Sequence, residues 1–417
     1  MSGSRTRFQQ HLPPKKGNPK ETSCVSTSGS LANSKEELTA MTAQIGLSRP
    51  ASNLGSLLLF AFLLALVAVL LCAAPTTGQV AATEATSQVL EVELPAPALE
   101  GNLMGSAPVQ GAAIYLPPTH SLSTQQRYPV IYLLHGIFDR YQTWLEDGFG
   151  VPAIVDRLIA TGEIPEVIVV MPNGVNQLGG GFYRNSPVSG NWADFIADDL
   201  VGFVDANYRT QARAESRAVT GHSMGGYGAI HLGMTRPEVF SIVWAMSPCC
   251  LSAVEDLGFG NDAWRRAIRF ETPEDLQASL QNGDFYPVAA VGILTAFSPD
   301  PDNPPLYVDF PYELVRGEVV LDDSEYDRYL DSLPVRQVDD HREALRSLRG
   351  LGVGVGLGDQ FIHIPAGTLE FSRRLGEERI PHLLDVYDGD HRQLVNQRLE
   401  QVILPWIAER LMYEDDR

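Results

Sequence analysis

The stretch RAVTGHSMGGYGAIHLGMT, residues 217–235, decides the fold class. Residues 217–220 are typical of a buried strand, and residues 224–235 predict a helix that stops before Pro237. Ser223 therefore lies on the turn between a strand and a helix, within the pattern Gly-x-Ser-x-Gly. A strand that runs directly into a helix indicates an α/β fold.

The residues of this pattern suit a nucleophilic serine for steric and electrostatic reasons. Side chains at Gly221 and Gly225 would collide as the chain doubles back around the serine. At the start of a helix, Ser223 lies where backbone N–H groups and the helix dipole favour negative charge. The N–H of Met224 would then point at an oxyanion formed on attack by Ser223. The alternative interpretation is a tight glycine turn of the kind found in any α/β protein, but the flanking strand and helix favour a nucleophile.

The alternation of strand and helix continues on both sides of this motif. Continuous apolar runs predict strands, and amphipathic or capped segments between them predict helices. The strands are expected at residues 129–134, 167–171, 241–246, 351–357 and 382–386, and the helices at 152–160, 192–208, 368–376 and from about residue 393. Buried strands that alternate with helices predict a mostly parallel central sheet with helices on both faces.

Two further segments break this alternation. Residues 89–94 and 111–116 predict two strands with no helix between them, so we expect an antiparallel pair, the first strand half-buried. Residues 252–340 contain helical pieces at 264–270 and 273–280 and a proline-rich stretch at 298–311. We interpret this segment as a cap-like insertion over the strand ends.

A general base and its acid are expected after Ser223 in the chain. Asp359 follows the strand 351–357 and His391 follows the strand 382–386, so both belong at the same sheet edge as Ser223. His391 would take the serine proton, and Asp359 would hold the imidazole in the right tautomer. Asp388 and Asp390 are alternative acids, although they lie on the same short loop as His391. The other histidines fit less well: His135 is expected to be structural, His222 to point away from the site, His231 to lie on a helix face and His341 to lie in the insertion.

Other site residues are predicted from the loops at the strand ends. The N–H of Ile137 is the expected second oxyanion donor, since Gly136 allows close approach of the backbone. Substrate contacts are predicted for Asp139, Trp144, Asn173 and Trp192, with core packing the favoured alternative for Trp192. No metal or organic cofactor is implied.

The charge distribution separates the N-terminus from the rest of the chain. Residues 1–50 carry seven Lys/Arg and three Glu, a net charge of +4. Since the net charge of the whole chain is −20, residues 51–417 carry a net charge of −24. All four lysines lie within the first 35 residues. An acidic folded part repels nucleic acid, so we expect no nucleic-acid partner.

An uncharged apolar run, residues 54–74, follows Arg49 and precedes small residues. This order is typical of a secretory signal, although the run is also long enough for a membrane anchor. The predicted organisation is a basic disordered tail (1–50), a signal peptide or anchor (51–78), a linker (79–87) and a folded domain (88–417). Met41 is an alternative start that would give the signal a conventional length. Either interpretation of the apolar run places the domain outside the cytoplasm, secreted or membrane-anchored.

Two cysteines, Cys249 and Cys250, lie in the predicted folded part. Adjacent cysteines seldom satisfy unstrained disulfide geometry with each other, so we expect buried thiols.

Several of these stretches resemble one family. YPVIYLLHGIFDRYQTW, VIVVMPNG, WADFIADDLVGFVDANYRT, RAVTGHSMGGYGAIHLG and DGDHRQL are similar to the esterase family of α/β-hydrolases, which includes S-formylglutathione hydrolase, feruloyl esterases and mycolyltransferases. The resemblance implies the α/β-hydrolase fold and a catalytic triad of Ser223, Asp359 and His391, with Met224 and Ile137 as oxyanion donors. Residues 252–340 do not share it.

The implied activity is an extracytoplasmic serine carboxylic-ester hydrolase that acts on a small-molecule or carbohydrate ester. Two alternatives stay open: an acyltransferase of the mycolyltransferase type, and a non-catalytic binding module on the same fold.

Overall fold

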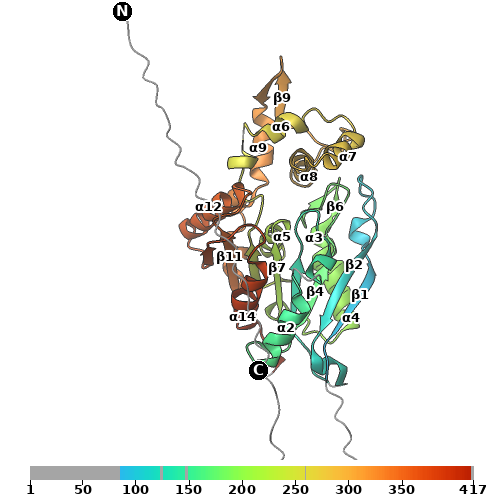
Figure 1. The fold of residues 1–417 in the computed structure, drawn as a ribbon, viewed down its shortest axis with the longest axis vertical. Coiled ribbons are helices and arrows are strands. Elements are labelled where there is room, and N and C mark those ends of the chain that lie inside the picture. The colour runs from blue at the N-terminus through green and yellow to red at the C-terminus, as the bar shows by residue number, and fades with distance from the viewer. Residues whose placement is uncertain (1–84, 123–124, 146–148, 259, 415–417) are drawn as a thin grey trace, which may run out of the picture. The chain divides into compact units, whose positions relative to one another are not determined.

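The computed structural model describes residues 85–122, 125–145, 149–258 and 260–414 (Figure 1). The predictions for residues 1–78, and the linker up to residue 84, lie outside the described residues. No described helix is long and apolar enough to cross a membrane.

An eight-stranded sheet forms the centre of the fold, in the order β1-β2-β4-β3-β7-β8-β11-β12 (Figure 1). Its strands are β1 Gln88–Pro95, β2 Val109–Leu116, β3 Val130–Leu134, β4 Ile168–Pro172, β7 Arg217–His222, β8 Ile242–Met246, β11 Gly350–Gly356 and β12 Leu383–Tyr387. Strand β2 is antiparallel to both β1 and β4, and all other pairs are parallel. The predicted mostly parallel sheet and the antiparallel pairing of the first two strands are both confirmed.

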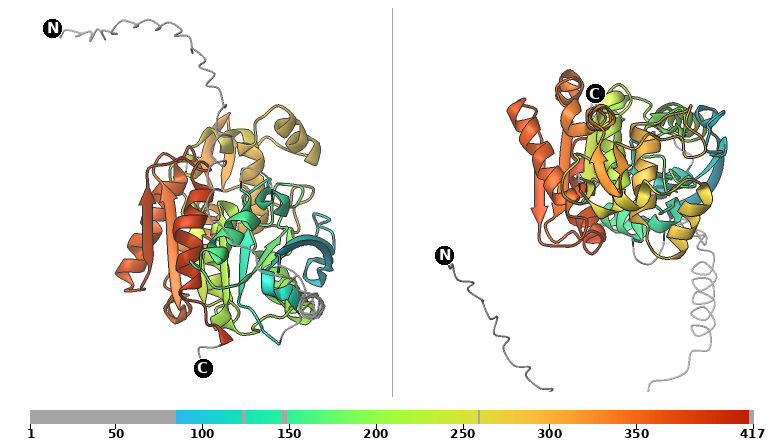
Figure 2. Two further views of the ribbon diagram at one scale, coloured as in Figure 1. Left: turned by 60° about the horizontal axis from the view of Figure 1, so that its bottom comes forward. Right: turned by 90° about the horizontal axis from the view of Figure 1, so that it is seen from above.

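Burial of the inner strands explains why helices cover both faces. All five residues of β3 are buried, and they alternate between two apolar cores. Val130, Tyr132 and Leu134 face one core, whereas Ile131 and Leu133 face the other. Helices lie on both sides of the sheet in Figure 2, as expected for strands that are apolar on both faces.

The first core lies beneath helix α5 (Met224–Thr235), helix α12 (His363–Glu377) and the helix that begins at Trp192. That last helix contains a π-helical segment, η4 Phe195–Leu200, between α3 Trp192–Asp194 and α4 Val201–Asn207. The second core is closed by α2 (Val151–Ala160) and by the C-terminal helix, α13 Val395–Arg398, η7 Leu399–Ile403 and α14 Leu404–Ala408. The predicted helices are therefore present, with ends shifted by a few residues.

Strand β1 differs from the prediction of a half-buried strand. Leu94 is fully buried, but Val89 and Leu90 are 40% and 36% exposed. The reason is position, since β1 is the edge strand of the sheet and pairs with β2 alone.

The segment 252–340 joins β8 to β11 and holds more structure than its sequence predicts. Its elements gather at one end of the sheet in Figure 1. They are η6 Glu255–Leu257, α6 Asp262–Ala267, α7 Pro273–Gln281, α8 Tyr286–Phe297, the hairpin β9 Tyr312–Val315 and β10 Glu318–Leu321, α9 Asp323–Asp331 and α10 Pro334–Gln337. Helix α8 was not predicted, because it is apolar on nearly all sides and therefore carries no amphipathic period.

The remaining elements are short and lie in connections. They are η1 Pro97–Leu99, η2 Pro118–Leu122, η3 Tyr141–Trp144, β5 Asn185–Ser186, β6 Gly190–Asn191, η5 Ala214–Ser216 and α11 Arg342–Ser347.

Candidate active site

Ser223 lies on the turn between β7 and α5 in a backbone conformation that L-residues rarely adopt. Its φ is +58° and its ψ is −116°, and the side chain is almost buried. A Cβ atom at Gly221 would lie 2.5 Å from the carbonyl carbon of Gly225, and one at Gly225 would lie 2.1 Å from the carbonyl oxygen of Leu134. Both glycines are therefore required by close packing of the turn, and the serine between them is strained.

Two backbone N–H groups lie near this serine, one at the start of α5 and one in the loop after β3. Met224 is the first residue of α5, so its N–H has no carbonyl one turn earlier to bond. In the loop after β3, the N–H of Phe138 donates to Gly179 (2.9 Å) and that of Asp139 donates to Gly136 (3.2 Å). The N–H of Ile137 has no partner within the described part of the chain. Both predicted oxyanion donors are thus free to bind an anion beside Ser223.

His391 and Asp359 form a buried pair. The Nδ1 atom of His391 lies 2.6 Å from Oδ2 of Asp359, and the side chain of Asp359 is fully buried. The second oxygen of Asp359 accepts the N–H of Phe361 (2.9 Å). This geometry holds the imidazole with Nε2 on the edge opposite to Asp359.

The alternative acids are placed differently. Asp388 and Asp390 are exposed. Oδ1 of Asp390 accepts the N–H groups of Gln393 (2.7 Å) and Arg392 (2.9 Å), and these two hydrogen bonds lower the pKa of Asp390. Asp390 therefore caps the turn after His391, while Asp359 lies behind its ring.

Ser223 and His391 line one cleft. Its volume is about 240 Å³, and Ile137, Asp139 and Phe361 lie on its walls. The serine comes from the β7–α5 turn and the histidine from the loop after β12, 168 residues later in the chain. Parallel strands place these loops together because their carboxyl ends meet at one edge of the sheet.

His222 does not point away from the site, so that prediction was wrong. Its ring centroid lies 4.4 Å from that of His391, and its Nε2 donates to the carbonyl oxygen of His391 (2.7 Å). Burial lowers the pKa of His222 well below its ordinary value, so the ring is neutral. The side chain of His222 lines the cleft and holds the backbone of His391.

His135 has the structural role expected of it. Its Nε2 accepts the N–H of Gly174 (2.8 Å), and its Nδ1 donates to the carbonyl oxygen of Gly136 (2.8 Å). Burial lowers the pKa of His135 to about 4, so the neutral ring keeps this pattern and supports the loop that carries Ile137.

The predicted substrate contacts need correction. Asp139 lines the cleft, but its carboxylate is paired with Arg392 (Oδ2 to Nη1, 3.1 Å). Trp144 is 1% exposed and packs against Phe149 in the second core. It lies too deep to meet a substrate.

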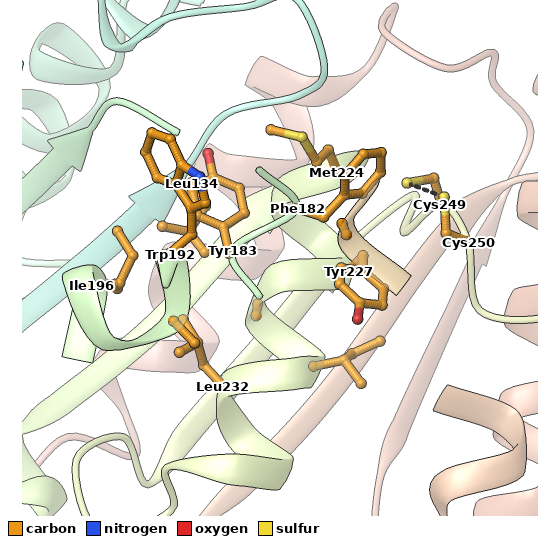
Figure 3. Packing of buried hydrophobic residues seen from close by; sticks show 14 of the residues in the cluster. Leu134, Phe182, Tyr183, Trp192, Ile196, Met224, Tyr227, Leu232, Cys249 and Cys250 are labelled. Atoms are coloured by element: carbon orange, nitrogen blue, oxygen red, sulfur yellow. Dashed lines mark hydrogen bonds between the residues drawn. The ribbon is translucent and has the colours of Figure 1, made fainter. Parts of the chain in front are cut away.

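Asn173 and Trp192 are also structural. Oδ1 of Asn173 accepts the N–H of Tyr141 (3.3 Å). Trp192 is fully buried, and its Nε1 donates to the carbonyl of Ser189 (2.8 Å); Figure 3 shows it beside Tyr183 in the core. Neither residue lines the cleft, because their side chains turn toward the sheet and the neighbouring loops.

A second, apolar pocket adjoins Ser223 on the side of the insertion. Its volume is about 60 Å³, and helices α6 and α8 form much of its wall. Phe285 and Phe361 line both this pocket and the cleft, and neither was predicted. Phe285 follows no recognisable motif, whereas Phe361 could have been considered from its position two residues after Asp359.

The two cysteines lie in the wall of the same pocket. Cys249 and Cys250 are buried free thiols with their sulfur atoms 3.0 Å apart (Figure 3). The expected buried thiols are confirmed. Among the described residues, no group of three or more His, Cys, Asp or Glu side chains is arranged to hold a metal ion.

Comparisons with known proteins show which proteins this chain is similar to. Residues 109–310 match a family model described as "Putative esterase". An esterase of Mycobacterium tuberculosis is 31% identical over 221 residues, which cover 46% of this chain and 44% of that protein. The endo-1,4-beta-xylanase/feruloyl esterase of Xylanibacter ruminicola is 35% identical over 136 residues, covering 32% of this chain and 18% of that protein. The chain thus spans less than half the length of either relative.

The fold has solved counterparts. A ferulic acid esterase superposes with a TM-score of 0.53 at 23% identity, and the match covers 78% of this chain and 98% of that chain. At this identity the likeness shows the fold alone. Residues 109–310, just under half of the chain, are thus similar to this esterase family, and the chain has the α/β-hydrolase fold.

Proposed function

We propose that the protein is a serine carboxylic-ester hydrolase with Ser223 as nucleophile, His391 as general base and Asp359 as the acid that orients it. One observation carries this proposal: Ser223 and the buried His391–Asp359 pair meet in one cleft beside two unpaired backbone N–H groups. The match of residues 109–310 to an esterase family model and the relatives named as esterases support it.

The residues suit acyl transfer in two steps. His391 Nε2 takes the proton of Ser223 as its Oγ attacks the ester carbonyl, and Asp359 stabilises the imidazolium. The N–H groups of Met224 and Ile137 bind the oxyanion, and His391 then gives the proton to the departing alcohol. In the second step, His391 takes a proton from a water molecule that attacks the acyl carbonyl, and it returns this proton to Ser223 Oγ as the acid leaves.

The decisive experiment compares Ser223→Ala with Ser252→Ala, which alters a buried serine outside both pockets. Hydrolysis of p-nitrophenyl acetate and butyrate should fall by roughly 10³-fold or more in Ser223→Ala, and little in the control. Activity that survives in Ser223→Ala would overturn the mechanism. Acyl transfer to a sugar acceptor, measured alongside, separates a hydrolase from an acyltransferase.

We also propose that the domain acts outside the cytoplasm, since the apolar run 54–74 follows a basic tail. N-terminal sequencing of the full-length gene product, purified from culture medium and from membranes, tests this. A mature terminus after the apolar run, at or before residue 79, supports a cleaved signal, and recovery in the membrane with an intact run supports an anchor. An intact protein found in the cytoplasm alone contradicts the proposal.

A further inference from the structure

A second aspartate–histidine pair lies in the wall of the apolar pocket. Oδ1 of Asp256 lies 2.7 Å from Nδ1 of His363 and also accepts the backbone N–H of His363 at 2.7 Å. The hydroxyl of Tyr286 donates to the other carboxylate oxygen. Asp256 comes from η6 after β8 and His363 from the first turn of α12, so the pair joins segments 107 residues apart.

This arrangement determines the tautomer of His363. Burial of Asp256 by itself raises its pKa, but the hydrogen bonds from His363 and Tyr286 outweigh burial and hold that pKa below its ordinary value. An ionised carboxylate can only accept, so Nδ1 of His363 carries the proton. In the neutral ring, Nε2 is consequently an acceptor with a free lone pair.

That acceptor is buried without a partner. His363 is 7% exposed, and its Nε2 has no hydrogen-bond partner among the described residues. A buried polar atom without a partner is unfavourable, and such atoms often mark the place of a ligand group. The ligand group that fits an acceptor is a donor, of which a hydroxyl is the simplest.

The pair lies within reach of the reacting serine. Asp256, Tyr286 and His363 line the same pocket as Ser223. The ring of Phe361 contacts both histidines, with centroids 4.9 Å from His391 and 6.5 Å from His363. Most other side chains on the pocket wall are aliphatic or aromatic, so an acyl group held there would meet a mainly apolar wall that includes the imidazole of His363.

The volume of the pocket limits the size of that acyl group. At about 60 Å³ it is much smaller than the roughly 150 Å³ cavity that holds a benzene ring in another protein. A short aliphatic chain fits this space, whereas an aromatic acyl group would require the insertion to move.

We propose that His363, oriented by Asp256, accepts a hydrogen bond from a hydroxyl group on a short acyl chain and thereby makes the enzyme selective for hydroxyacyl esters. The inference rests on the proposed esterase function and names its substrate class. His363 acts here as a substrate-positioning residue and takes no part in bond cleavage.

The test compares ethyl butyrate with ethyl 2-hydroxybutyrate and ethyl 3-hydroxybutyrate, using a pH-stat to follow acid release. Wild type should hydrolyse at least one hydroxy ester with a kcat/KM at least 10-fold above that of ethyl butyrate. His363→Leu should abolish that preference while changing kcat/KM for ethyl butyrate less than about 3-fold, since ethyl butyrate has no hydroxyl to bond His363. Asp256 loses the Nδ1 donor in this variant but keeps the backbone N–H of residue 363 and the hydroxyl of Tyr286 as donors. Comparing the same ester pair in both proteins cancels any difference in intrinsic ester reactivity.

Two further variants serve as controls. His363→Gln places an amide near the position of Nε2 and should restore part of the preference. His382→Leu removes a histidine that bonds Ser372 outside the pocket, and should keep all of it. The rate with ethyl butyrate reports on folding in each variant.

The outcomes separate the two proposals. Equal hydrolysis of all three esters by wild type, or an equal loss on all three in His363→Leu, overturns the hydroxyacyl inference and leaves the esterase proposal standing. A folded wild-type protein that hydrolyses neither these esters nor p-nitrophenyl esters overturns the esterase proposal itself.

Discussion

The Nδ1 atom of His391 lies 2.6 Å from Oδ2 of Asp359, in a place from which water is excluded on the carboxylate side. Asp359 and His391 lie 32 residues apart, on the loops after two neighbouring parallel strands, β11 and β12. This pairing orients the second nitrogen of the imidazole, and several expectations follow from it.

Replacing Asp359 by Asn should reduce kcat by roughly 10⁴-fold, because an amide can stabilise the wrong tautomer of His391 and cannot balance an imidazolium. Asp390→Asn is the matched control, since Asp390 is exposed and caps the following turn. It should retain activity within a few-fold of wild type. Steady-state kinetics with p-nitrophenyl butyrate measure both, and similar losses in the two variants would contradict the assignment of Asp359.

Replacing His222 by Leu should lower kcat by roughly 10- to 100-fold, because the loop that carries His391 loses the donor bonded to its carbonyl oxygen. The effect on KM should be small, since His222 acts on the position of His391 rather than on the acyl group. Unchanged kcat in a folded His222→Leu protein would show that the loop is held by other contacts.

Replacing Gly225 by Ala should destabilise the protein severely, since the new Cβ would meet the Leu134 carbonyl oxygen at 2.1 Å and the His135 carbonyl oxygen at 2.9 Å. Backbone atoms cannot move aside as a flexible side chain can, so a loss of several kcal/mol is expected. Gly202→Ala is the control. A Cβ there meets nothing within 4 Å on the exposed side of α4, and the higher helix propensity of Ala should add about 0.5–1 kcal/mol. The free energy of unfolding of both variants is measured by urea titration. A Gly225→Ala protein as stable as wild type would contradict the prediction.

Stability should fall as pH falls below the ordinary pKa of histidine, about 6.5. Burial lowers the pKa of His231, and the positive charge of nearby Arg184 adds to this effect, so that the pKa is about 3. Between pH 6.5 and 3, His231 binds a proton in the unfolded chain but stays neutral in the folded protein. Its contribution to stability is therefore complete above pH 6.5 and decreases below it. The loss is about 1.4 kcal/mol per pH unit for one such group in the middle of that range.

The variant His231→Phe isolates this effect. Phe keeps the ring that stacks on Tyr227 but cannot bind a proton. Its unfolding free energy, measured by urea titration at pH 7.0, 6.0 and 5.0, should decrease less steeply than that of wild type. Parallel curves for the two proteins would show that His231 does not contribute to the pH dependence.

The sequence by itself determined the kind of fold and the identity of the strained serine. The Gly-x-Ser-x-Gly pattern around Ser223 can be recognised without coordinates because its five residues are consecutive, although a Cβ at Gly225 would collide with Leu134 of β3, which is distant in the sequence. The order of strands and helices can likewise be predicted from the local periodicity of apolar residues. Asp359 and His391 were predicted as site residues because each follows a predicted strand.

Only the tertiary structure decided what surrounds the serine. Trp144 and Asn173 follow strand ends in the sequence, yet their side chains turn to the core and to a neighbouring loop, since side-chain direction depends on which surface is already covered. Helix α8 gives no periodic signal because it is buried on nearly every side. The pairing of Asp256 with His363 joins segments 107 residues apart, and no local pattern encodes a contact made by the packing of an insertion against the sheet.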